Sequence, residues 1–261
     1  MTVISLNGHP TWARLPKGSG GVVVLLHGGM SSSASMLRSI GPRLSRRFAL
    51  AAFDRRGHGR TGDTAAPFSY DDMADETIAF IEMLDRRVFL VGHSDGGNVA
   101  LLVAMRRPDL VKRAVLVGAN YNAAGLMPLP VFDTQSVEFE QWAARYGELS
   151  PDGVEHASVV AEKTEVMTAT QPTLTLADLA TVDVPVLVMA GDDDVATLEH
   201  TCSMYEAIPE AQLAILPGTS HSVLKERPKD CARLIRRFLL GDVPPVTEAP
   251  VRRRKSPAET E

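Results

Sequence analysis

Short runs of apolar, often β-branched residues alternate along the chain with longer stretches whose apolar residues recur at helical spacing. This alternation is typical of parallel strands connected by helices. Six runs are predicted to be buried strands, at residues 22–26, 48–53, 88–91, 114–117, 184–190 and 213–216. Ahead of them, residues 2–6 and 11–14 flank Asn-Gly-His-Pro, which indicates a hairpin packed antiparallel at the sheet edge. We expect an α/β fold with a mostly parallel sheet of about eight strands.

Helix-length patterns fill most of the gaps between these strands. They lie at Ser35–Leu44, Tyr70–Leu84, Asn98–Arg107, Leu198–Ile208 and Cys231–Leu240. Residues 120–181 break the rhythm, because a strandless stretch of about 60 residues is too long for an ordinary connection. We therefore predict a helical cap inserted into a core made of residues 1–119 and 182–241. Residues 242–261 are rich in proline and charge, which predicts a disordered tail.

One stretch of the predicted cap has a helical apolar face. Phe139, Trp142, Ala143 and Tyr146 follow one another at spacings that place them on the same side of a helix. This face either packs onto the core or lines a substrate pocket, with Trp142 as the candidate substrate contact.

Charge and composition narrow the function classes. The 261 residues carry a net charge of −5 and no long basic stripe in the body of the chain, so nucleic-acid binding is not indicated. Small neutral or cationic partners fit this balance better. The start of the chain lacks a secretory signal, and no apolar run is long enough to span a membrane. The two cysteines do not indicate a disulfide framework. We expect a cytoplasmic protein without a membrane contact; the oligomeric state is not predicted.

The strongest chemical motif is Gly-His-Ser-Asp-Gly-Gly at residues 92–97. It places Ser94 between an apolar strand and an apolar helix, which is the context of a nucleophile elbow. The turn requires small residues two positions on either side of the serine, and Gly92 and Gly96 satisfy this requirement. We expect the Ser94 hydroxyl to stand clear of the sheet as a nucleophile.

A serine nucleophile needs a base, and the base needs a carboxylate that orients it. His221 follows the last predicted strand across a short loop, so it lies at the same edge of the sheet as Ser94. Asp192, Asp193 and Asp194 follow the strand before it. Their position alone does not separate the three aspartates.

The third requirement is a pair of N–H donors for an oxyanion. His-Gly-Gly-Met at residues 27–30 forms a glycine-rich turn after the first long strand, and we choose the backbone N–H groups of Gly29 and Asp95, with Met30 as the alternative. The Asp95 carboxylate opposes the negative charge that its own N–H would stabilise. It either turns away into local hydrogen bonds or basic partners, or contacts a cationic group of the substrate.

Together these motifs resemble the α/β-hydrolase fold family, and the resemblance runs from about residue 20 to about residue 240. The residues that carry it are the segments 27–29, 54–59, 92–97, 191–194 and 220–221. In that family the acid is usually the last position of Gly-x-x-Asp, which implies Asp194, and the chain order is serine, aspartate, histidine. The Ser-Asp-Gly-Gly elbow is similar to that of small-cap esterases of the valacyclovir-hydrolase-like group.

The resemblance implies a serine hydrolase that cleaves a small-to-medium carboxylic ester through an acyl-enzyme. Ser94, Asp194 and His221 form the expected triad, and no metal or cofactor is predicted. Lactones, amino-acid esters or amides, and carbon–carbon bonds are alternative substrates for the same triad. A binding protein without catalysis is the alternative of a different class, and turnover of an activated ester separates it from an enzyme.

Overall fold

The computed structural model describes residues 2–127, 133–242 and 245–249, and its strands form one eight-stranded sheet. The strands are β1 (Thr2–Leu6), β2 (His9–Arg14), β3 (Val22–Leu26), β4 (Ala49–Phe53), β5 (Val88–His93), β6 (Val111–Val117), β7 (Val186–Asp193) and β8 (Ala211–Ser220). Their order is β1-β2-β4-β3-β5-β6-β7-β8. Only the β1/β2 and β2/β4 pairs in this part of the chain are antiparallel. The predicted sheet and its antiparallel edge hairpin are confirmed.

The edge hairpin turns at Asn7 and Gly8. Both residues have positive φ, 49° and 83°, and Leu6 pairs directly with His9 across the turn. A two-residue turn of this kind needs left-handed backbone, which asparagine and glycine tolerate best. The Asn-Gly pair therefore sets the register of β1 on β2.

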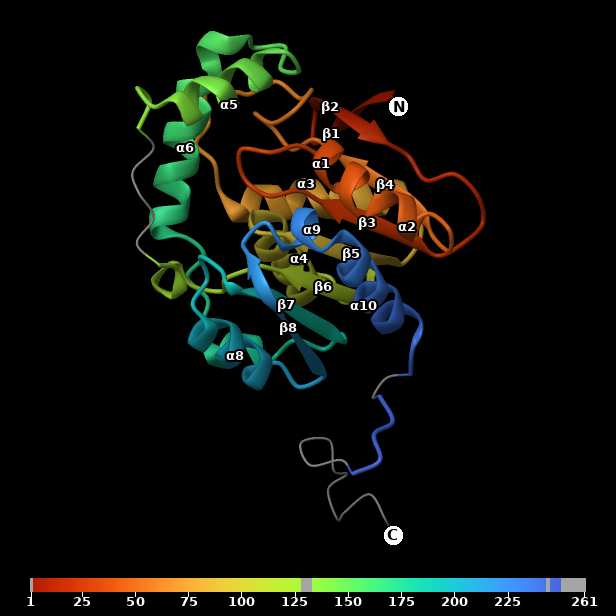
Figure 1. The fold of residues 1–261 in the computed structure, drawn as a ribbon. Helices are drawn as coiled ribbons and strands as arrows, with labels where there is room; N and C mark the ends of the chain where they lie inside the picture. The colour runs from red at the N-terminus through yellow and green to blue at the C-terminus, as the bar shows by residue number, and fades with distance from the viewer. Residues whose placement is uncertain (1, 128–132, 243–244, 250–261) are drawn as a thin grey trace.

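Helices cover both faces of the sheet (Figure 1). They are α1 (Ser33–Ser39), α2 (Gly41–Leu44), α3 (Tyr70–Met83), α4 (Asp95–Arg106), α5 (Val137–Gly147), α6 (Ala157–Thr170), α7 (Leu176–Leu179), α8 (Leu198–Ala207), α9 (Val223–Glu226) and α10 (Pro228–Leu240). Buried residues of α3, α4 and α8 belong to one hydrophobic cluster, and those of α1, α2, α9 and α10 to another. The parallel strands therefore have no face open to water.

The side chains of β3 show how one strand serves both clusters. Val22, Val24 and Leu26 join the cluster under α3 and α4, whereas Val23 and Leu25 join the cluster under α1 and α10. Successive side chains of a strand point to opposite faces, so a strand buried on both sides must be apolar throughout. This is why the strand appears in the sequence as an unbroken apolar run.

Between β6 and β7 the described residues form helices and no named strand, as expected for a helical cap. Isolated antiparallel bridges join Asn122 to Thr173 and Leu126 to Ala196, so the chain leaves and re-enters the core at neighbouring points. Figure 1 shows α5 and α6 together at one side of the molecule, beyond the sheet. The boundaries proposed for the core and the cap stay predictions.

A buried carboxylate attaches the cap to the core. Asp63, whose side chain is 1% exposed, pairs with Lys163 of α6 at 2.6 Å and with His156 at 3.0 Å. Burial alone raises the pKa of Asp63, but hydrogen bonds from Lys163 and His156 outweigh it and hold that pKa below its usual value. The ionised carboxylate therefore ties two cap elements to the loop after β4.

No helix in the described ranges is both long enough and apolar enough to span a bilayer. Of the predicted disordered tail at residues 242–261, residues 243–244 and 250–261 lie outside the described part of the chain.

The turn between β5 and α4 packs backbone directly against the end of β3. A Cβ atom at Gly96 would lie 2.2 Å from the carbonyl oxygen of Leu26, and one at Gly92 would lie 2.0 Å from the carbonyl oxygen of Gly96. Neither contact leaves room for a methyl group, and backbone cannot move aside as a flexible side chain does. Glycine at these two positions is therefore a condition of the fold.

We expect Gly96→Ala to destabilise the fold by about 3 kcal/mol, because the added methyl group forces α4 away from β3. For a domain of this size that corresponds to a melting temperature lower by roughly 6–12 °C, measured by circular dichroism. Gly20→Ala is the control, because its new Cβ would meet nothing nearer than 3.6 Å. Similar melting temperatures for both variants would contradict this account.

Candidate active site

Three predicted site residues each lie one position beyond a strand. Ser94 follows β5, Asp194 follows β7 and His221 follows β8. Because these strands are parallel, their carboxyl ends meet at one edge of the sheet, where α/β folds bind ligands. The glycine-rich turn after β3 lies at the same edge. The topology therefore brings the predicted site residues together.

Ser94 has a strained backbone. Its φ of 53° and ψ of −126° lie outside the regions that residues with a side chain prefer, and its N–H donates to the carbonyl of Val117 at 2.8 Å. α4 starts at the next residue. Strain of this kind persists only where the surroundings enforce it, and it is the conformation that a nucleophile elbow requires.

Asp194 is the aspartate that contacts His221. Its Oδ1 lies 2.6 Å from His221 Nδ1, and its side chain is 1% exposed. Burial raises the pKa of Asp194, but the hydrogen bond and the charge of His221 outweigh it and leave that pKa below its usual value. Asp192 is exposed and accepts from the Thr219 N–H, and Asp193 is exposed as well. The geometry therefore favours Asp194 among the three predicted candidates.

Two further residues hold the imidazole of His221 in place. His93 Nε2 donates to the carbonyl of His221 at 2.8 Å. Burial, followed by the charge of His221, lowers the pKa of His93 to about 4, so its ring stays neutral near pH 7. Gly118, which has a φ of 57°, packs directly against the His221 ring, because a Cβ at this position would come within 3.0 Å of His221 Nδ1.

Ser94 and His221 line the same pocket. Nδ1 of His221 is engaged by Asp194, which leaves Nε2 as the nitrogen that can act on the serine. Within the described ranges the Ser94 hydroxyl makes no hydrogen bond. The serine–histidine proton transfer therefore stays a prediction.

The predicted oxyanion turn lies against the elbow. A Cβ at Gly28 would lie 3.1 Å from Ser94 Cβ, and one at Gly29 would lie 2.4 Å from Asp95 Oδ2. Met30 has a φ of 49° and ends the glycine-rich turn. Its carbonyl accepts a hydrogen bond from Trp142 Nε1 at 2.7 Å. The turn is thus held between the elbow and α5 of the cap. Its N–H groups as oxyanion donors remain a prediction.

The Asp95 carboxylate is buried beside this turn. It is 6% exposed, and its Oδ1 accepts from the Tyr70 hydroxyl at 2.7 Å. Its Oδ2 has no hydrogen-bond partner among the described residues, and Asp95 is not one of the residues that line the pocket there. The contact with Tyr70 favours the local role predicted for this carboxylate over a contact with a substrate cation.

A buried arginine supplies the opposite charge. Arg55 is 0% exposed; its Nη2 donates to the Gly28 carbonyl at 3.2 Å and lies 3.3 Å from His27 Nδ1. Burial lowers the pKa of Arg55 below its usual value, and attraction to Asp95 is the largest effect that opposes this shift. Arg55 therefore supports the oxyanion turn and balances the charge of Asp95.

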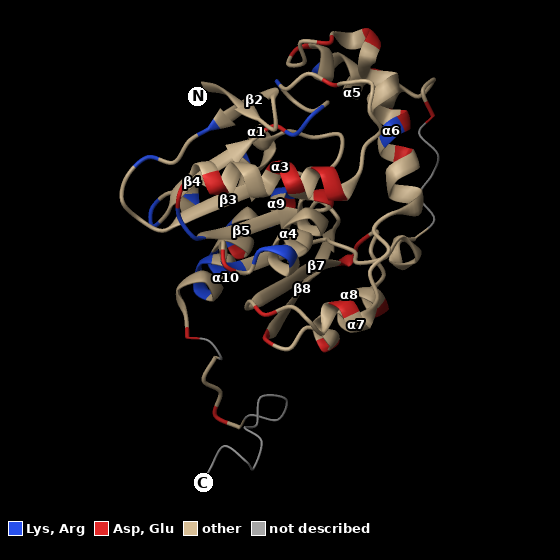
Figure 2. Cartoon of the chain, turned by 180° about the vertical axis from the view of Figure 1, so that it is seen from behind, with Lys and Arg blue, Asp and Glu red and all other residues tan. Residues whose placement is uncertain are grey.

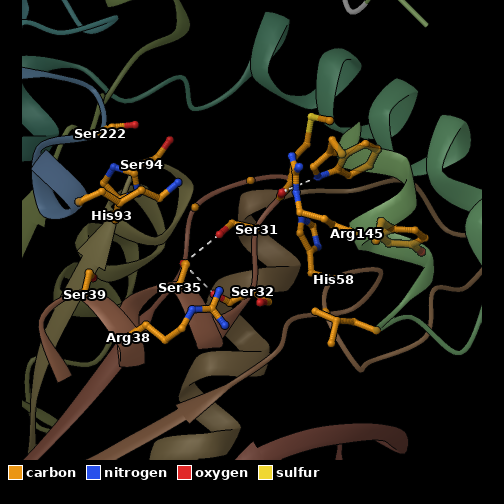
Figure 3. A pocket seen from close by; sticks show the side chains of 18 of the residues that line it. Ser31, Ser32, Ser35, Arg38, Ser39, His58, His93, Ser94, Arg145 and Ser222 are labelled. Carbon is orange, nitrogen blue, oxygen red and sulfur yellow. Dashed lines mark hydrogen bonds between the residues drawn. The ribbon is translucent and has the colours of Figure 1, made fainter. Parts of the chain in front are cut away.

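The pocket above these residues has a volume of about 930 Å³ (Figure 3). Trp142 and Tyr146 of α5 line it, whereas Ala143 on the same helix face is buried. The face therefore packs at Ala143 and lines the pocket at Trp142 and Tyr146, and Trp142 as a substrate contact stays a prediction. In the described part of the chain, no group of three or more histidine, cysteine or acidic residues is arranged to hold a metal ion.

Sequence reasoning missed the polar wall of this pocket. Arg38, Arg43, Arg145 and Lys225 line it, together with five serines besides Ser94, of which Ser31, Ser32 and Ser35 belong to one run. The run Ser-Ser-Ser-Ala-Ser at residues 31–35 was a visible signal. The four cations come from four different helices, and the acidic net charge of the whole chain gave no indication of them.

Comparisons with known proteins agree with this fold. A family model described as "Alpha/beta hydrolase family" matches residues 23–234. A putative carbamate hydrolase of Caulobacter sp. (strain K31) is 26% identical over 84% of this chain and 91% of its own. A non-heme haloperoxidase of Rhodococcus erythropolis is 30% identical over 79% of this chain and 87% of its own.

Among solved structures, a serine hydrolase involved in carbazole degradation superposes with a TM-score of 0.73. The two chains are 25% identical, and the match covers 91% of this chain and 97% of the other.

We expect Asp194→Asn to lower kcat for an activated ester by about 10⁴-fold, because an amide no longer sets the tautomer of the imidazole. Asp192→Asn and Asp193→Asn are matched controls in the same loop and should stay within about threefold. Steady-state kinetics with p-nitrophenyl butyrate measure all three. A larger loss in either control would move the role to that aspartate.

We expect Trp142→Phe to lower kcat by about three- to tenfold, the range that the loss of one hydrogen bond gives. The phenyl ring keeps the wall of the pocket but no longer holds the Met30 carbonyl. Tyr121→Phe is the control, because it removes a 3.1 Å hydrogen bond to Ser203 outside the pocket. Equal kcat values for the two variants would exclude a role for Trp142 in positioning the turn.

Proposed function

Because the chain belongs to the alpha/beta hydrolase family, we propose that it cleaves a small-to-medium carboxylic ester through an acyl-enzyme. Ser94 is the proposed nucleophile, His221 the base and Asp194 the group that orients the base. The observation that carries the proposal is the 2.6 Å contact between His221 and Asp194 at the pocket that the strained Ser94 also lines. The similarity to a serine hydrolase supports it.

In the first half of the reaction, Ser94 Oγ attacks the carbonyl carbon of the ester and His221 Nε2 takes the hydroxyl proton. The carbonyl oxygen becomes an oxyanion, which the N–H groups of Gly29 and Asp95, or Met30 as the alternative, would stabilise. The imidazolium then gives its proton to the leaving alcohol. The carbon–oxygen bond breaks and leaves an acyl group on Ser94.

In the second half, His221 takes a proton from water, and the resulting hydroxide attacks the acyl carbon. The new oxyanion collapses, the proton returns to Ser94 Oγ, and the carboxylic acid leaves. Asp194 holds Nδ1–H of His221 throughout and stabilises each imidazolium. The pair of His93 and Gly118 keeps the ring in position.

Lactones, amides and carbon–carbon bonds remain alternative substrates for the same residues. Each differs from an ester in its leaving group, and none changes the role of Ser94. Purified protein assayed against acyl esters of graded length, lactones and amino-acid esters distinguishes them by kcat/KM. A lactone or amide preferred over every ester would replace the ester in this proposal and keep the triad.

The decisive variant is Ser94→Ala, for which we expect at least a 10³-fold loss of kcat/KM on p-nitrophenyl butyrate, roughly the loss caused by removing a triad member. Ser45→Ala, an exposed serine outside the pocket, is the control and should keep full activity. A fluorophosphonate probe should label the parent protein once and Ser94→Ala not at all.

A folded parent protein that neither hydrolyses any ester nor reacts with the fluorophosphonate would overturn the proposal. That result would favour a binding protein. Circular dichroism of each variant checks that lost activity does not come from unfolding.

A further inference from the structure

The pocket over Ser94 carries an excess of positive charge. Four cationic side chains line it, those of Arg38, Arg43, Arg145 and Lys225, against the single carboxylate of Glu148. Within the described ranges none of the four forms an ion pair within 4.0 Å. Their charges are therefore available to a ligand.

These cations converge from separate parts of the fold. Arg38 belongs to α1 and Arg43 to α2, Lys225 belongs to α9, and Arg145 comes from α5 of the cap. In the view of Figure 3, His93 and Ser94 lie on one side of the pocket and Arg145 on the other, with Arg38, Ser31 and Ser35 between them. Segments far apart in the chain thus surround the same space with one sign of charge.

The polar face of α1 is directed at the pocket. Ser35, Arg38 and Ser39 occur at the spacing of one helix face and all line the pocket, whereas Met36 on the opposite side is buried in the core. Ser32, at the start of the helix, also lines the pocket, and its side chain does not cap any N–H of the helix. A neutral donor therefore lies beside the cations.

This local charge is opposite to that of the whole chain, whose net charge is −5. Figure 2 shows basic residues on α9 and α10 and acidic residues on α3 and α8. The net charge favoured neutral or cationic partners, but a ligand at the site meets the field of its lining. A cationic substrate would be repelled from the place where Ser94 acts.

We propose that the substrate carries a carboxylate in addition to the bond that is cleaved, and that Arg38, Arg145 and Lys225 select it by charge. This inference rests on the proposed function, because it names the substrate class of the same site. The cations lie in the wall and not at the reacting atoms, so they act on specificity. The Ser32 hydroxyl, which caps no N–H of α1, can donate a hydrogen bond to a bound carboxylate.

The test compares two p-nitrophenyl esters of equal length. Mono-p-nitrophenyl glutarate ends in a carboxylate and p-nitrophenyl pentanoate in a methyl group, and p-nitrophenyl 4-aminobutyrate adds a cationic ester. We expect kcat/KM to be highest for the glutarate and lowest for the aminobutyrate. The preference should weaken as salt is raised, since mobile ions screen exposed charges.

Substitution of each cation tests whether Arg38, Arg145 and Lys225 cause the preference for the glutarate ester. We expect three variants, Arg38→Gln, Arg145→Gln and Lys225→Gln, each to lower the glutarate-to-pentanoate ratio of kcat/KM by about three- to tenfold. This is the effect of removing one attraction between unit charges roughly 7 Å apart at an effective dielectric of roughly 40–80. Arg86→Gln is the matched control, because Arg86 is exposed and precedes β5 at the opposite edge of the sheet. It should leave the ratio unchanged.

The outcomes separate this inference from the proposed function. Active enzyme that prefers the pentanoate, or whose ratio is the same in Arg38→Gln and Arg86→Gln, overturns the inference and leaves the ester hydrolase standing. Absence of any ester turnover overturns both. Competitive inhibition by glutarate supports a carboxylate, whereas inhibition by inorganic phosphate alone would reassign the site to a phosphorylated substrate.

Discussion

The contact between Gly96 and the end of β3 determines where the rest of the site lies. Because the backbone of α4 touches the carbonyl of Leu26 with no side chain between them, Ser94 after β5 and the glycine turn after β3 form one rigid unit. The N–H of Ser94 bonds to Val117, which ties the same unit to β6. Asp194 and His221 then need only extend from the next two strands to reach it. Close backbone packing therefore positions the proposed site before any of its side chains makes a contact.

The acidic residue after the nucleophile has an electrostatic explanation. An isolated carboxylate about 6 Å from an oxyanion would oppose it by about 3 kcal/mol at an effective dielectric of about 20. Here the Asp95 carboxylate accepts from the Tyr70 hydroxyl and feels the positive charge of the fully buried Arg55. Arg55 in turn holds the Gly28 carbonyl. The charge that would hinder the proposed oxyanion is thus opposed by the residue that also holds the glycine-rich turn.

Sequence reasoning succeeded where local pattern determines position. Apolar runs located the strands because a parallel strand buried on both faces must be apolar throughout, and Ser94 and His221 followed from the ends of those strands. The choice of Asp194 among three neighbours came from the family resemblance, because position alone does not show which carboxylate reaches the imidazole. The bonds of Tyr70 to Asp95 and of Trp142 to Met30 join residues 25 and 112 positions apart, so no local pattern reveals them. The same holds for the cations of the pocket.

The bridge between Asn122 and Thr173 closes the base of the cap. Since the two ends of the insertion already lie together, the free energy of closing that loop grows only slowly with the number of residues it contains. The cap can therefore lengthen, shorten or be replaced during evolution with little effect on the sheet that carries Ser94, Asp194 and His221. Residues that reach back to the core, as Trp142, His156 and Lys163 do, must be kept. If Ser94, Asp194 and His221 act as proposed, the insertion can vary in length between Asn122 and Thr173 while the sheet that carries these residues stays the same.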